Sequence, residues 1–130
     1  MSATEYLGLA EDYLTAAENN LQAGLLNPAA SAAVHAAICA NDAVCLALSG
    51  ERSSSKTHGE AVRLLRQACK GTPFEAEAGR RARQLTDILS VKTEAEYSGR
   101  RVSEREAARV VEQARRLVRW AREVVIARGM

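Results

Sequence analysis

The stretch SEREAARVVEQARRLVRWAREVVIAR (residues 103–128) predicts a long amphipathic helix and decides the fold class. Ser103 is a residue type that caps helix N-termini, and Glu106 follows it at the spacing of a capping box. Apolar residues then recur every three or four positions, which places them on one wide helical face. They are Ala107, Val110, Val111, Ala114, Leu117, Val118, Ala121, Val124 and Val125.

Three more helix starts lie upstream, at Asn27–Pro28, Thr57–Glu60 and Thr72–Glu75. The two Thr residues each precede a Glu at capping-box spacing. Asn27 and Thr72 are each followed by Pro, which the first helical position tolerates because its missing N–H has no helical partner there. We therefore expect helices over residues 4–22, 28–49, 57–70, 73–96 and 103–128, with Gly50 ending the second.

These helices predict an all-α fold, an antiparallel four-helix bundle in which the short helix over residues 57–70 caps one end. No segment alternates with a period of two, so strands are not expected. At 130 residues, we expect a single domain over 1–130. Alanine supplies much of the 47% hydrophobic content, and aromatic residues only 4%, so a large internal cavity is not expected.

The cysteines and the N-terminus favour a cytoplasmic protein. Cys39, Cys45 and Cys69 are odd in number and form no CxxC pair, which fits a reducing compartment. The first residues lack the basic and apolar regions of a secretory leader. No stretch holds the roughly 18 consecutive apolar residues of a membrane span. We expect no membrane contact and no cofactor, and the net charge of +2 neither favours nor excludes nucleic acid.

Four segments together resemble the HEPN domain family. They are AAVHAAICANDAVCLALSG (residues 32–50), THGEAVRLL (57–65), LSVKTEAEYSG (89–99) and SEREAARVVEQARRLVRWAREV (103–124). The resemblance extends from about residue 29 to 125. It implies a small helical bundle, often dimeric, of the kind found in toxin–antitoxin systems, beside minimal nucleotidyltransferases and in RNA processing.

The resemblance also locates the position of a ribonuclease motif that this chain lacks. Active HEPN ribonucleases carry Arg, four to six residues and then His near the end of the penultimate long helix. The matching stretch here is 92–97, where Lys92 replaces the Arg and no His occurs. The chain therefore resembles the branch without the catalytic pair, and we expect a non-catalytic binding or interaction module that takes nucleotide, RNA or a partner protein.

A literal Arg–His match lies elsewhere, at Arg52 and His58 with five residues between them. It crosses a loop and a helix start, so the two side chains do not share a helical face. The alternative function is a metal-independent endoribonuclease with His58 as acid/base and Arg52 stabilising phosphate charge.

The candidate ligand-binding residues are Asp42, His58, Lys92 and Tyr97. Lys92 continues an inward apolar stripe and must pair or reach solvent, with Asp42 as a possible partner. His58 titrates near neutral pH but also fits a first-turn packing role. Tyr97 fits packing better than base stacking.

Arginines recur on the last two predicted helices and the turn between them. They are Arg80, Arg81, Arg83, Arg100, Arg101, Arg105, Arg109, Arg116 and Arg119. If they converged, they could hold RNA phosphates. The Glu residues among them favour an ordinary solvated surface. Trp120, at the edge of the last apolar stripe, is expected in the core or at an oligomer contact.

Two features of residues 28–49 have alternative interpretations. His35, Cys39 and Asp42 recur on one helical face and could supply three metal ligands, but without a fourth we favour packing roles. Small residues cover much of this helix, and we expect some to lie outside the core at a symmetric dimer contact. They are Ala29, Ala32, Ala33, Ala36, Ala40 and Ala43.

Overall fold

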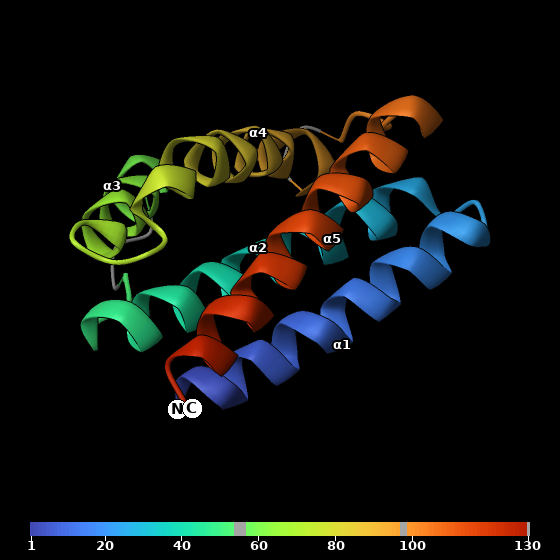
Figure 1. The fold of residues 1–130 in the computed structure, drawn as a ribbon. Helices are drawn as coiled ribbons and strands as arrows, with labels where there is room; N and C mark the ends of the chain where they lie inside the picture. The colour runs from blue at the N-terminus through green and yellow to red at the C-terminus, as the bar shows by residue number, and fades with distance from the viewer. Residues whose placement is uncertain (54–56, 97–98, 130) are drawn as a thin grey trace.

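The computed structural model of the chain describes residues 1–53, 57–96 and 99–129, without the side chains of 92–96. These ranges form an all-α bundle, as predicted, and contain no strand (Figure 1). The elements are α1 (Ala3–Gln22), α2 (Leu26–Ser49), α3 (His58–Cys69), the short 3₁₀ helix η1 (Glu75–Glu77), α4 (Ala78–Glu96) and α5 (Glu104–Ala127).

Capping residues fix several helix starts. The side chains of Thr57 and Ser103 accept hydrogen bonds from the backbone N–H groups three residues on, at 3.3 and 3.1 Å, as predicted. At α1, Ser2 and Glu5 form a complete capping box that the sequence analysis missed, since each side chain accepts from the other's backbone N–H at 3.1 Å. Gly50 ends α2 in the left-handed conformation, with φ of 75°.

Asn27 is not the N-cap that the sequence predicted, because α2 already begins at Leu26. Its side chain is used over a long range instead. The amide nitrogen donates to the carbonyl of Arg100 at 3.1 Å, and the amide oxygen accepts from the N–H of Val102 at 2.9 Å. Asn27 therefore joins the start of α2 to the connection that precedes α5.

The predicted helix start at Thr72–Pro73 is also wrong by several residues. The Thr72 hydroxyl accepts from the N–H of Phe74 at 3.2 Å and donates to the carbonyl of Cys69 at 2.7 Å. Glu75 turns back and accepts from the N–H of Gly71 at 2.9 Å. These bonds hold a tight turn and the 3₁₀ helix η1, so α4 begins only at Ala78.

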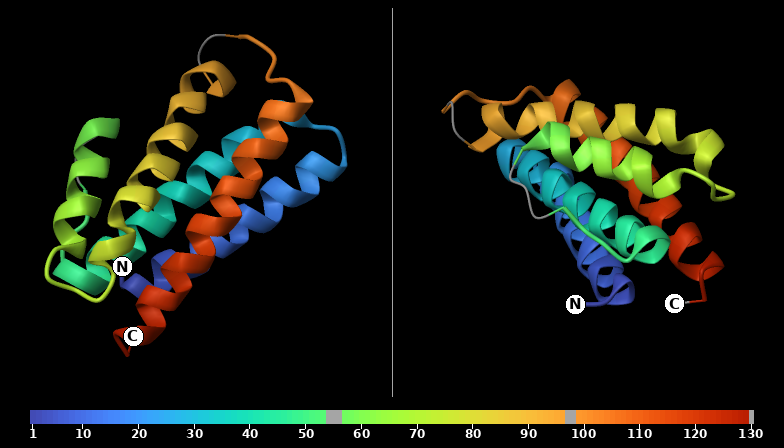
Figure 2. Two further views of the ribbon diagram at one scale, coloured as in Figure 1. Left: turned by 45° about the horizontal axis from the view of Figure 1, so that its top comes forward. Right: turned by 90° about the vertical axis from the view of Figure 1, so that its left-hand side faces the viewer.

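Helix α2 is the centre of the bundle and packs against each of the other α-helices. α1 runs antiparallel to α2, and α5 lies against both (Figure 1). The two views of Figure 2 place α3 alongside α4 and α2, whereas the sequence suggested that it would cap one end.

The close packing around α2 depends on its alanines. Of the six proposed for a dimer contact, only Ala32 is partly exposed, and the rest have no accessible surface: Ala29, Ala33, Ala36, Ala40 and Ala43. The expectation that some lie outside the core therefore fits only the partly exposed Ala32, because the small side chains elsewhere on α2 let neighbouring helices approach.

Among the described residues, α2 is long and apolar enough, by length and mean composition alone, to pass as a membrane span. Two-thirds of its most apolar window is buried inside the bundle, however, and Asn41 and Asp42 are buried within it. Its apolar character is accounted for by its place at the centre of the core.

Candidate functional site

Asp42 lies near the C-terminal end of α2 and is only 7% exposed. Its Oδ2 atom is 4.0 Å from Nη1 of Arg52, which follows the helix in the chain. The Arg52 guanidinium also lies over the ring of Tyr6 in α1, 5.5 Å from the ring centroid. This Asp42–Arg52–Tyr6 cluster connects two helices and the loop after α2.

Burial dominates the electrostatics of this cluster. Burial raises the pKa of Asp42 to about 6, while the nearby Arg52 charge opposes that rise. The neighbouring Asn41 is buried as well, and its amide nitrogen donates to the carbonyl of Ala61 in α3 at 3.4 Å. The polar residues of α2 thus contact Arg52 and α3.

The two residues of the alternative ribonuclease site are not brought together by a described contact. Arg52 faces Asp42 and Tyr6, and it also lines a cleft of about 330 Å³ beside Glu51, Glu60 and Arg63. His58 is partly exposed as the first residue of α3 and does not line that cleft.

Of the four candidate ligand residues, the structure describes two fully. Asp42 contacts Arg52, not His58, in the described part of the chain. Lys92 belongs to α4, but its side chain lies outside the described residues, as does all of Tyr97. The proposed Lys92–Asp42 pair therefore stays a prediction, and Arg52 is the partner that the structure gives Asp42.

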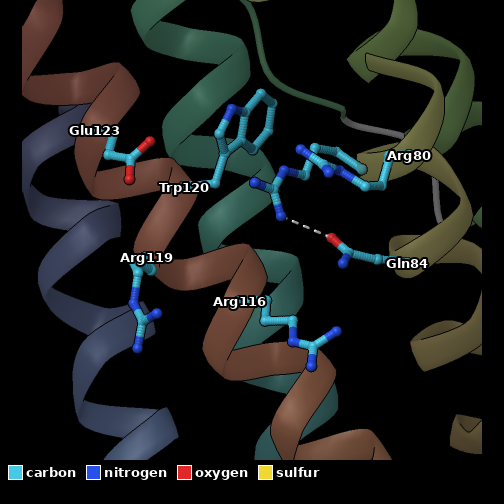
Figure 3. Close-up of a pocket in the computed structure, with 7 residues that line it drawn as sticks. Arg80, Gln84, Arg116, Arg119, Trp120 and Glu123 are labelled. Atoms are coloured by element: carbon cyan, nitrogen blue, oxygen red, sulfur yellow. Dashed lines mark hydrogen bonds between the residues drawn. The ribbon is translucent and has the colours of Figure 1, made fainter. Parts of the chain in front are cut away.

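A cleft of about 290 Å³ between α4 and α5 has a basic lining. We name it the α4–α5 cleft, and Figure 3 shows its lining. From α4 come Arg80, Arg81 and Gln84, and from α5 come Arg116, Arg119, Trp120 and Glu123.

Trp120 forms the floor of the α4–α5 cleft and belongs to the core, since it is only 1% exposed. Phe74 meets it edge-on, with ring centroids 6.4 Å apart. The Arg81 guanidinium lies over the indole, 5.4 Å from the ring centroid, and donates to Oε1 of Gln84 at 3.1 Å. No pattern in the sequence predicts this Arg81–Trp120 contact, which joins residues far apart in the chain.

Other arginines of α5 have a structural role. Arg109 pairs with Asp87 of α4, and Arg122 pairs with Glu11 of α1. Arg115 reaches Glu18 of α1 at 2.8 Å and also pairs with Glu112. Of the nine arginines singled out in the sequence, four line the cleft, and Arg109 joins α5 to α4. Arg83, Arg100, Arg101, Arg105 and Arg109 are not part of that lining.

The suggested metal ligands do not gather. Within the described ranges, no three His, Cys, Asp or Glu side chains come close enough to hold a metal ion. His35 stacks on Tyr13 of α1, with ring centroids 5.3 Å apart.

All three cysteines are free thiols. Burial is the main cause that raises the pKa of Cys39 and Cys69 to about 11 and that of Cys45 to about 12. The unreactive thiol form therefore predominates at neutral pH.

A family model for the HEPN domain matches residues 3–124. The chain therefore belongs to the HEPN domain family, and the match extends the sequence resemblance through α1. No curated protein matches the chain.

Proposed function

We propose that this chain is a HEPN binding module without ribonuclease activity. The observation that carries the proposal is the placement of Arg52. Its guanidinium is 4.0 Å from the Asp42 carboxyl group and lies over the Tyr6 ring, and no described contact brings it to His58. An active Arg–His pair needs both side chains at one phosphate. The Lys at position 92 and the lack of His in residues 92–97 support the same proposal.

The module acts in the cytoplasm as a homodimer or with a protein partner, such as a minimal nucleotidyltransferase, in a toxin–antitoxin setting. Family membership supports this assembly. The outer face of α1 supports it too, because Leu9 and Tyr13 are 36% and 39% exposed one helical turn apart.

Cleavage of mixed tRNA and mRNA in the presence of EDTA tests the absence of catalysis. We expect no cleavage by the folded wild type and none by His58→Ala or Arg52→Ala. Cleavage by the wild type that disappears in both variants, with their helical content unchanged by circular dichroism, would show the alternative endoribonuclease and overturn the proposal.

A further inference from the structure

We propose that the α4–α5 cleft is a binding site for a short run of closely spaced phosphates, such as a triphosphate group. The inference rests on the proposed function as a binding module and specifies the class of ligand. Four arginines line the cleft and one carboxylate, Glu123, lines it with them. This excess of cations concentrates positive potential in a concave surface with a low-dielectric floor.

Arg81 provides the fixed part of the site. Its side chain is 14% exposed and is held between the Trp120 ring and the Gln84 amide oxygen, with Nη2 also 3.9 Å from Oε2 of Glu77. Its Nε atom is buried and has no hydrogen-bond partner among the described residues. Burial, and then the repulsion of Arg80, lowers the pKa of this guanidinium. Glu77 and Glu123 oppose this lowering in part, and a bound anion would further offset the repulsion between Arg80 and Arg81 without a prior rearrangement of the Arg81 side chain.

Arg80 and Arg116 provide the adaptable part. Each is 59% exposed, and each pairs with a glutamate one turn earlier in the chain. The nitrogen–oxygen distances are 3.9 Å for Arg80–Glu77 and 3.3 Å for Arg116–Glu112. Exposed ion pairs of this kind contribute little free energy to stability, so both guanidinium groups can turn towards a phosphate at a low cost in free energy. One planar guanidinium group can donate two parallel hydrogen bonds to two oxygens of a phosphate.

The shape of the cleft selects phosphate and not base. Its one aromatic residue, Trp120, is buried and covered by Arg81, so it offers no stacking surface for a nucleobase. Figure 3 places Arg119 and Glu123 on the flank of α5 away from Arg80. The ligand is therefore compact, and its contacts centre on Arg80, Arg81 and Arg116.

Titration calorimetry with inorganic triphosphate tests the site directly. We expect wild-type binding that weakens between about 50 and 200 mM salt. The double variant Arg80→Ala/Arg116→Ala should lose about tenfold or more in affinity, because it removes two charge-assisted contacts. Arg83→Ala/Arg105→Ala is the matched control, since it removes one arginine from each of the same helices outside the cleft, and it should bind like the wild type.

Glu123→Gln should change the affinity for triphosphate in the opposite direction. It removes the one carboxylate in the lining, so triphosphate should bind more tightly than to the wild type. Because the cleft offers no stacking surface for a nucleobase, ATP should bind with the same affinity as triphosphate alone. Arg81 is left intact in these variants because its packing on Trp120 makes it a stability residue as well.

Three results overturn the inference: no triphosphate binding by the wild type, equal losses in the cleft and control variants, or binding of single-stranded RNA without binding of triphosphate. The last would assign the surface to an RNA chain. None of these results depends on RNA cleavage, so the cleavage assay in EDTA tests the proposed function separately.

Discussion

At the scale of single residues, Asp42 is a carboxyl group whose buried environment changes its chemistry. Its pKa is about 6 in the fold, against 3.8 for a free carboxyl. The folded chain therefore binds this proton more tightly than the unfolded chain does. Acidification from pH 6 towards pH 4 favours the fold through this group, and ionisation above pH 6 costs up to about 3 kcal/mol.

Asp42→Asn removes that ionisation, so it should raise the free energy of unfolding relative to the wild type at pH 7.5. At pH 4 or below, where the wild-type carboxyl is protonated, the advantage should vanish. Urea denaturation of both proteins at the two pH values measures this. A constant difference between them across the range would contradict a raised pKa.

Asp42 also shows which contacts could not be predicted from the sequence. An acidic residue on an apolar helix indicated the need for a partner, and the inward position of Lys92 suggested one. The structure gives Asp42 a contact with Arg52 from a polar loop, whose path no helical periodicity predicts. Likewise the Arg81–Trp120 contact depends on how two helices pack, which pattern alone does not determine.

At the scale of elements, the residue types at helix ends predicted those ends that are set by hydrogen bonds between nearby residues. Thr57, Ser103 and Gly50 act at helix ends as their types predict. The failures at Asn27 and Thr72 have one cause, because each side chain has a competing partner outside its expected helix. Asn27 bonds to residues more than 70 positions away, and Thr72 bonds back to the end of α3.

The packing of α2 makes a prediction at this scale. Ala36 has no accessible surface, and leucine there would force α2 away from its neighbours. Ala36→Leu should destabilise the fold by about 1–3 kcal/mol or more. Ala32→Leu on the same helix is the control, since Ala32 is partly exposed and its variant should change stability less. Thermal and urea unfolding compare them, and equal effects would contradict the close approach at Ala36.

At the scale of the whole molecule, the sequence predicted an all-α chain but not how α3 lies. Amphipathic stripes show which face each helix buries, and α3 and α4 both bury theirs. Which helix lies beside which depends on the fit of small and large side chains across α2, and the sequence pattern leaves that open.

Assembly is the whole-molecule prediction. We expect a dimer mass by light scattering, and a monomer mass for Tyr13→Glu, which would bury a charge in the contact. Thr15→Glu adds the same charge to another face of α1 and should stay dimeric. A monomeric wild type at high concentration would rule out the homodimer and leave the partner protein as the alternative.

The three thiols, two buried and Cys39 partly exposed, have a practical consequence for labelling. With pKa values of about 11 to 12, each forms far less than 1% thiolate at neutral pH, and thiolate is the species that reacts with maleimide and similar dyes. A single cysteine placed on an exposed turn would therefore react first in the otherwise native chain. Fluorescence studies of this protein can begin without a cysteine-free background.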